Sequence, residues 1–246
     1  MVMTIPMKTT KWIYTALMIV LFGHVHGQFK LDIQYVDAKV KHDTNCSALH
    51  YNLRIPHLIG DSRYADVVAL VNDSIDALVR EADVPTPEEV EYWNSLTGLC
   101  DETGFGPDKM DMTYEEGLLD SKYVSVVVIT SYFAGNGGRG GLMECHTFNL
   151  DIGRKKALQW KDVLTDKNRL RLHEKMKEEF RRLNNSDIAD EMEVEQLKGW
   201  SVTDKDVIFY YARIIQPGFE LIIPVRLPIK DVRSYFIPKY RRLLPR

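Results

Sequence analysis

A glycine-rich segment holds the first residues whose types and spacing suggest chemistry. Gly135-Asn136-Gly137-Gly138-Arg139-Gly140 spells G-x-G-x-x-G, the spacing with which dinucleotide-binding proteins approach a pyrophosphate. Such a site needs a helix directly after the glycines, because the helix N-terminus holds the phosphates. The next residues, LMECHTFNLD, alternate like a strand, so we interpret the glycines as a hairpin connection that permits positive φ. Because five glycines in seven residues exceed what a tight turn requires, we assign Gly135–Arg139 to a candidate binding surface.

The densest polar cluster follows these glycines and comprises Glu144, Cys145, His146 and Asp151. A Cys–His nucleophile pair needs both side chains on one side of the fold, whereas neighbours on a strand point to opposite faces. Cys145 and His146 therefore cannot act together. Glu144 and His146 share a face and could ligate a metal, but a catalytic zinc site usually has three protein ligands. We therefore assign no catalytic residue, no metal site and no cofactor.

A second candidate surface lies where a strand rich in aromatic residues ends. The segment FYYARIIQPGF contains Tyr210, Tyr211, Ile214 and Pro217 beside an arginine. Aromatic and arginine side chains are common among the residues that dominate the binding energy of interfaces. These four residues complete the candidate binding site. The alternative is that the two tyrosines alternate between the core and the sheet surface.

The first 27 residues have the pattern of a secretory signal peptide. Lys8 and Lys11 precede an apolar run from Trp12 to Phe22, and Gly27 ends the segment. The run is shorter than the roughly 20 apolar residues of a membrane span. We expect cleavage after Gly27, a secreted or periplasmic protein, and no membrane span after cleavage.

Charge argues against one class of partner. Removing Lys8 and Lys11 changes the formal net charge from −3 to −5, which does not suit a nucleic-acid-binding protein. The C-terminal tail KYRRLLPR is basic. We interpret the tail as a solvated end or, alternatively, as a segment that rests on an anionic envelope polymer.

Three cysteines remain after cleavage: Cys46, Cys100 and Cys145. In an oxidising compartment the simplest count is one disulfide and one free thiol. We favour Cys46–Cys100, because both lie in loop-like sequence whereas Cys145 lies in a predicted strand. The other two pairings stay open.

Hydrophobic periodicity predicts the elements that position these residues. Alternation predicts a strand over 29–40, with Phe29, Leu31, Ile33 and Tyr35 on one face. Apolar residues at spacings of three and four predict helices over 61–82 and 166–183. Further strands are predicted over 48–56, 122–133, 142–152, 206–214 and 218–227, short helices from Pro87 and over 228–236, a loop over 98–118 and a mobile connection over 184–199. The β-branched residues of 122–133 fall on both faces, so this strand is expected in the centre of a sheet.

The strands mostly join through tight turns, which indicates an α+β fold. We expect an antiparallel sheet with helices packed on one face, in two closely packed subdomains.

The C-terminal half resembles a known family in its order of turns and strands. The segments SVVVITSYFAGNGGRGG, TFNLDIGRKKALQWKDVL and WSVTDKDVIFYYARIIQPGFELIIPVRLPIKDV follow one another as in the extracytoplasmic domain of RsiV-like anti-sigma factors and PdaC-like peptidoglycan deacetylases. The resemblance covers residues 121–236, and the preceding HYNLRIPHLIGD and VNDSIDALVREA are similar to the small companion domain of that family. One departure is Arg139-Gly140, where the family often has Ala-His.

The resemblance implies a companion subdomain at 28–118 and an RsiV/PdaC-like domain at 119–246, after a signal peptide at 1–27. It also implies an exported, non-catalytic binding module of the bacterial envelope, because RsiV-like proteins bind lysozyme through this region. The candidate ligands are a lysozyme-type muramidase and peptidoglycan. Two alternatives stay open: a hydrolase of cell-wall glycans or peptides centred on Glu144 and His146, and a structural envelope protein without a ligand.

Overall fold

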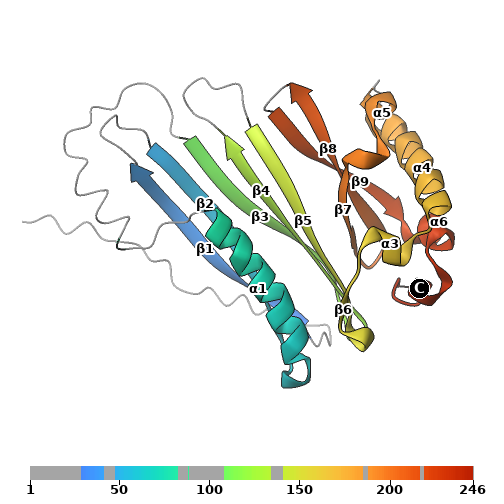
Figure 1. Ribbon diagram of the computed structural model, residues 1–246, viewed down its shortest axis with the longest axis horizontal. Coiled ribbons are helices and arrows are strands. Elements are labelled where there is room, and N and C mark those ends of the chain that lie inside the picture. Colours follow the sequence, from blue (N-terminus) through green and yellow to red (C-terminus); the bar gives the residue numbers. More distant parts are fainter. Residues whose placement is uncertain are drawn as a thin grey trace, which may run out of the picture.

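The computed structural model describes residues 29–41, 48–82, 88, 108–133, 141–184, 188–216 and 219–245 of the 246-residue chain (Figure 1). The strands are β1 (Phe29–Lys41), β2 (Ala48–Gly60), β3 (Asp108–Leu119), β4 (Tyr123–Phe133), β5 (Gly141–Asp151), β6 (Lys156–Ala157), β7 (Leu197–Val202), β8 (Asp206–Gln216) and β9 (Phe219–Pro228). The α-helices are α1 (Ala65–Glu81), α3 (Trp160–Val163), α4 (Asp166–Asn184), α5 (Ile188–Glu191), α6 (Ile229–Val232) and α7 (Pro238–Arg241). Short 3-10 helices are η1 (Ser62–Tyr64), η3 (Ile152–Arg154), η4 (Val194–Gln196) and η5 (Arg233–Tyr235).

The strands run in the order β1-β2-β3-β4-β5-β9-β8-β7, and β6 pairs with β5 off this path. A single bridge between Gly141 and Phe219 joins β5 to β9, so the arrangement is a six-stranded sheet, β1–β6, beside a three-stranded antiparallel sheet, β7–β9. The predicted α+β fold is confirmed. The β2–β3 pair is parallel, unlike the tight antiparallel turns that the sequence led us to expect, because α1 lies in the connection between these strands.

The two sheets lie between two helical layers (Figure 1). α1 packs on one face of the six-stranded sheet, and α4 packs on the outer face of β7–β9. Between the sheets, Val127 of β4 packs with Ile208 and Tyr210 of β8. Each sheet thus carries helices on one face, and the opposite faces of β3–β5 and of β7–β9 meet.

β4 has the central position that its sequence predicts. Val124, Val126 and Val128 pack in the cluster that contains α1, whereas Val127 packs against β8. A strand buried on both faces needs β-branched residues at successive positions rather than an apolar–polar alternation. The pattern of residues 122–133 therefore has its physical cause in the two layers that enclose β4.

Both long predicted helices are present, with their apolar stripes inward. In α1, Val67, Val71 and Ile75 are buried at helical spacing. Asp61 caps the preceding η1, because its side chain accepts a hydrogen bond from the backbone N–H of Arg63. α4 buries its own stripe of Leu172, Met176 and Phe180.

Two strands lie where loops were predicted. β3 occupies part of the predicted loop 98–118, and β7 occupies the end of the predicted connection 184–199. β3 alternates, but its face away from α1 is polar, and Gly117 breaks the apolar pattern. The carbonyl oxygen of Val202 would lie only 2.6 Å from a Cβ at Gly117, so a glycine is required where β7 crosses β3.

The predicted face of β1 is wrong for Tyr35. Phe29 is buried, but Tyr35 is 71% exposed and Val36 packs toward the core instead. The side of β1 that faces the core changes near Ile33. The partner of Ile33 in β2 is Pro56, which is buried and directly follows the buried Ile55. Two consecutive buried residues in β2 interrupt the alternation of the paired strands.

The predicted subdomain boundary falls at the β3–β4 turn. β3 ends at Leu119 and pairs antiparallel with β4, so the chain segments on both sides share one sheet. The predicted signal segment and the predicted helix from Pro87 lie outside the described residues, apart from Glu88. Across the part of the chain that the structure describes, no helix is long and apolar enough to cross a membrane.

A buried polar network joins the two sheets. Asn149 Oδ1 accepts from the Tyr123 hydroxyl at 2.6 Å and from the Ser125 hydroxyl at 2.9 Å, and Asn149 Nδ2 donates to Trp200 O at 2.6 Å. The Val202 N–H in turn donates to Ser125 Oγ at 3.1 Å. Backbone groups of the edge strand β7 thus find partners on β4 and β5, which fixes the register of one sheet on the other.

Candidate functional site

The structure separates the predicted binding residues of β8 by burial. Tyr210 and Tyr211 are 0% and 1% exposed, and they point to opposite faces of the strand. Ile214 is 65% exposed. Among these three, only Ile214 offers its side chain directly to a partner. The other predicted binding residues, Gly135, Asn136, Gly137, Gly138, Arg139 and Pro217, lie outside the described residues.

Tyr210 belongs to a polar link between the sheets. Its hydroxyl donates to Glu115 Oε2 at 2.8 Å and lies 3.1 Å from Ser201 Oγ. Arg226 Nη2 lies 3.7 Å from the same Glu115 oxygen. Burial raises the pKa of Tyr210 far above its usual range, so its hydroxyl stays protonated and keeps donating at neutral pH. Glu115 is therefore held between a neutral donor and a cation where β3, β8 and β9 meet.

Tyr211, on the other face of β8, contacts the buried His173 of α4. His173 Nδ1 lies 2.8 Å from the Tyr211 hydroxyl, and His173 Nε2 lies 3.2 Å from the backbone oxygen of Met192. A neutral imidazole satisfies both contacts, since Nε2–H donates to the carbonyl and Nδ1 accepts from the tyrosine. Burial is the main reason that the pKa of His173 is lowered. Through these hydrogen bonds, His173 connects α4 to β8 and to the segment before β7.

A shallow pocket of about 140 Å³ opens beside the exposed Ile214. It is lined by Met192, Gln196, Tyr211, Ala212, Arg213, Ile214 and Ile223. Small-molecule sites usually have volumes of roughly 300–1,000 Å³. The pocket beside Ile214 is smaller than such sites, and the exposed Ile214 belongs to its lining.

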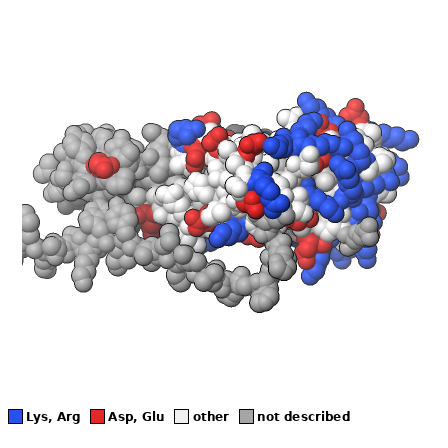
Figure 2. All heavy atoms as spheres, turned by 90° about the horizontal axis from the view of Figure 1, so that it is seen from below, with Lys and Arg blue, Asp and Glu red and all other residues white. Residues whose placement is uncertain are grey.

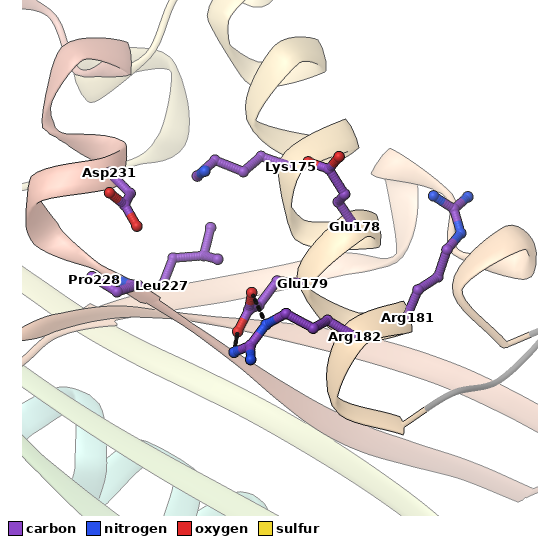
Figure 3. A pocket seen from close by; sticks show the side chains of 8 residues that line it. All are labelled: Lys175, Glu178, Glu179, Arg181, Arg182, Leu227, Pro228 and Asp231. Atoms are coloured by element: carbon purple, nitrogen blue, oxygen red, sulfur yellow. Dashed lines mark hydrogen bonds and ion pairs between the residues drawn. The ribbon is translucent and has the colours of Figure 1, made fainter.

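A larger open groove of about 570 Å³ runs between α4 and the end of β9 (Figure 3). It is lined by Lys175, Glu178, Glu179, Arg181, Arg182, Leu227, Pro228 and Asp231. Leu227 and Pro228 form the apolar part of the lining below Lys175 and Asp231, and Arg182 Nε donates to Glu179 Oε2 at 2.9 Å. Charges of both signs beside a short apolar strip suit an extended polar segment of a partner.

The predicted separation of Cys145 from His146 is present in β5. Cys145 pairs with Ile129 and packs toward the second sheet, whereas His146 pairs with Val128 on the face that carries α1. Burial, assisted by the nearby Glu115, raises the pKa of the Cys145 thiol to about 12. The thiolate, which is the nucleophilic form, is therefore scarce at neutral pH.

Glu144 and His146 lie on one face, as predicted, with Glu144 Oε2 3.5 Å from His146 Nε2. Burial is the main cause that lowers the pKa of His146, and Glu144 acts in the opposite direction. The described residues contain no group of three or more His, Cys, Asp or Glu side chains placed to hold a metal ion. The favoured partners Cys46 and Cys100 lie outside the described residues, and Cys145 has a free thiol.

The acidic and basic residues are unevenly distributed between the two halves of the sequence, and the overall net charge does not reveal this. Residues 28–118, the acidic half, contain 7 Lys and Arg and 18 Asp and Glu, a net charge of −11. Residues 119–246, the basic half, contain 23 Lys and Arg and 17 Asp and Glu, a net charge of +6. Figure 2 shows Lys and Arg side chains gathered at the end of the molecule that carries β7–β9 and α4. Counting charge for each half separately finds this signal in the sequence.

The solved structures with a similar fold include two DUF3298 family proteins. The chain is similar to a member of the DUF3298 family from Bacteroides fragilis, with 13% identity, a TM-score of 0.59, and coverage of 87% of this chain and 96% of that one. It is also similar to a DUF3298 family protein from Pseudomonas aeruginosa, with 15% identity, a TM-score of 0.52, and coverage of 88% and 98%. No protein-family profile and no curated protein matches the sequence. At these identities the likeness shows a shared α+β fold over most of both chains.

Proposed function

We propose that this chain is an exported, non-catalytic binding protein of the bacterial envelope. The observation that carries the proposal is how the reactive side chains are used. Cys145 is a protonated thiol on one face of β5 and His146 lies on the other, while His173 and Tyr210 are engaged in buried structural bonds. The remaining surface features suit a macromolecular partner: an exposed Ile214 beside a small pocket, and an open charged groove.

The proposed contact surface is the rim formed by Ile214 and the pocket next to it. An exposed apolar side chain beside a small pocket can be covered by a partner, and the contacts around it then exclude water. The predicted loop 135–139 and Pro217 remain part of this proposal. The candidate ligands are a lysozyme-type muramidase and peptidoglycan.

Retention of residues 28–246 on immobilised lysozyme and, separately, on insoluble peptidoglycan tests the proposal at two salt concentrations. We expect Ile214→Asp to abolish retention on one of these ligands, because it places a charge at the centre of an apolar contact. The matched control is Ile59→Asp, which changes another exposed strand isoleucine, 40% exposed, in the acidic half. Retention on neither ligand, or equal retention of both variants and the unchanged protein, would overturn the proposal.

One observation favours the alternative of a cell-wall hydrolase: Glu144 and His146 lie 3.5 Å apart on a sheet face. A carboxylate and an imidazole at this distance can share acid–base work if a substrate reaches them. Turnover of peptidoglycan fragments that is lost in Glu144→Gln would support the hydrolase. Absence of turnover in the unchanged protein would leave the binding role.

A further inference from the structure

Four exposed cations converge near the C-terminus and form what we call the cationic cluster: Arg154, Lys156, Lys239 and Arg242. Two of them lie against the ring of Tyr240, with Lys239 Nζ 4.8 Å and Arg154 Cζ 5.4 Å from its centroid. Arg154 Nη1 and Arg242 Nη2 lie 3.1 Å and 3.8 Å from the same oxygen of Asp151. Residues from η3, β6 and the C-terminal segment are thus brought together by tertiary structure.

The anions of this region lie inward and the cations lie outward. The side chain of Asp151 is 1% exposed, whereas those of Arg154 and Arg242 are 39% and 60% exposed. Lys156 Nζ bonds to Asp162 Oδ1 at 2.6 Å, with side chains 51% and 16% exposed respectively. A partner that approaches this surface therefore meets four positive groups before it meets either carboxylate.

The backbone that carries the cluster is fixed before any ligand arrives. Tyr240 is 3% exposed, and the neighbouring Leu243 and Leu244 belong to the core. Arg233 Nη1 donates to Arg241 O at 2.9 Å, and Arg241 Nε donates to Phe236 O at 2.8 Å. Because these bonds hold the C-terminal turn, little backbone entropy is lost when the cluster binds a partner.

The shape of the surface distinguishes among anionic partners. The side chains of Arg154, Lys156 and Arg242 are 39%, 51% and 60% exposed, and such open cations suit repeated charges better than one enclosed anion. A membrane-surface site combines basic residues with inserted apolar side chains. The described large apolar side chains that are exposed lie on other elements: Tyr35, Ile59, Leu70, Tyr132, Leu142, Leu170 and Ile214.

We propose that the cationic cluster binds a polymer of the cell envelope that carries repeated phosphate groups. The inference rests on the proposed function, since it names a ligand class for the exported binding protein, but it uses a surface separate from the Ile214 rim. The net charge of +6 over the basic half attracts such a polymer from a distance, and the cluster provides the close contacts. Lys239 and Arg242 are the most suitable test residues, because both are exposed at the end of the fold.

The test uses long-chain inorganic polyphosphate as the probe and residues 28–246 as the protein. If each of four cations neutralises one phosphate, raising salt from 50 to 200 mM weakens binding by about 50-fold, by the slope that single-stranded nucleic acids follow. Lys239→Gln combined with Arg242→Gln leaves two contacts, so the same change weakens the residual binding by only about sevenfold. The control pair Lys30→Gln and Arg80→Gln removes two exposed cations from the acidic half and should retain the full salt dependence.

Two further measurements complete the test: a charge-conserving variant and binding to lipid vesicles. The pair Lys239→Arg and Arg242→Lys keeps both charges and should bind as the unchanged protein does, while thermal unfolding verifies the fold of each variant. Equal affinity and salt dependence in the Gln pair and the unchanged protein would overturn the inference. Binding to phosphatidylglycerol vesicles without binding to polyphosphate would overturn it as well. If the unchanged protein does not bind polyphosphate but shows Ile214-dependent retention, only this inference is refuted. If it binds polyphosphate through the cluster but shows no Ile214-dependent retention, only the proposed function is refuted.

Discussion

The acidic and basic halves of the molecule differ in how the faces of their sheets are covered. β1, β2 and β3 carry α1 on one face, and the other face, up to the C-terminal part of β3 that β7 crosses, presents exposed polar pairs such as Asn52 with Asp111. The sheet β7–β9 is covered on both faces, by α4 outside and by β4 and β5 inside. Bonds at the covered junction have no access to water, whereas those on the open face exchange readily with water. We therefore expect stability to depend on the junction and to depend little on the open face.

The largest effect expected from this comparison is that of Asn149→Ala. The substitution leaves the Tyr123 hydroxyl, the Ser125 hydroxyl and Trp200 O without their buried partner. Each unsatisfied buried group costs about 1–3 kcal/mol, so the free energy of unfolding should fall by at least about 3 kcal/mol. The matched control is Asn52→Ala on the open face, with an expected loss below about 0.5 kcal/mol. Urea denaturation measures both, and similar losses would remove the distinction between the two faces.

Gly117→Ala should have the next largest effect. An added Cβ would lie 2.6 Å from Val202 O and 2.8 Å from Ser125 O, both backbone atoms that cannot move aside without shifting a strand. Overpacking of this kind costs about 1–3 kcal/mol. At Gly153, where the nearest atom to an added Cβ is Asp151 Oδ1 at 3.5 Å, the same substitution should cost far less. A Gly117→Ala protein as stable as the Gly153→Ala protein would show that the sheets can separate slightly without loss.

A comparison of β4, α1 and α4 with β3 shows how much of the fold the sequence alone predicts. β4, α1 and α4 are predictable because each buries a long, regular pattern on one stripe or on both faces. β3 is not predictable in this way, because one of its faces is polar and Gly117 interrupts the apolar pattern. The need for that glycine arises only when β7 crosses β3. Local patterns report burial by neighbouring layers, but they do not report which layer will cover a given face.

The same limit applies to the candidate site. Aromatic residues and an arginine at the end of β8 suggest an interface, and Ile214 is the one of the three described site residues that is exposed. Tyr210 and Tyr211 are buried because β8 is enclosed by β4 on one face and by α4 on the other. Alternation predicts that the two rings point apart, but only the three-dimensional arrangement shows that both faces are covered.

His173 makes the junction of the basic half sensitive to acid. Burial lowers its pKa in the folded state, so the fold favours the neutral imidazole. Its contribution is fully present above the unfolded pKa of about 6.5 and is lost as pH falls from there toward the lower folded pKa. Within that window stability should fall by up to about 1.4 kcal/mol per pH unit from this group. His146, whose pKa burial also lowers, adds a second acid-dependent contribution.

Urea denaturation from pH 7.5 to 5 measures this effect. His173→Gln keeps hydrogen-bonding groups beside Tyr211 but does not titrate, so its acid-dependent loss of stability should be smaller than that of the unchanged protein. Glu174 and Glu195 raise the pKa of His173 and Lys177 lowers it, and all three stay in place in this variant. An unchanged acid dependence in His173→Gln would assign the effect to other groups.

The smallest effect should come from a contact that joins the two halves by charge. Lys155 Nζ lies 2.6 Å from Asp66 Oδ2, which ties the turn after η3 to the start of α1, with side chains 60% and 72% exposed. Opposite net charges suggest that attraction holds the halves together, but an ion pair in water gains little, because solvent and salt screen it. Lys155→Gln, Asp66→Asn and the double variant should therefore all unfold at the same urea concentration as the unchanged protein. If the effects of the two substitutions on stability are coupled, and the coupling weakens in high salt, attraction between the halves contributes to the stability of the fold. Without such coupling, the pairing of β3 with β4 and the close contact of Gly117 with Val202 and Ser125 hold the halves together, and the segregated surface charge is available for binding partners.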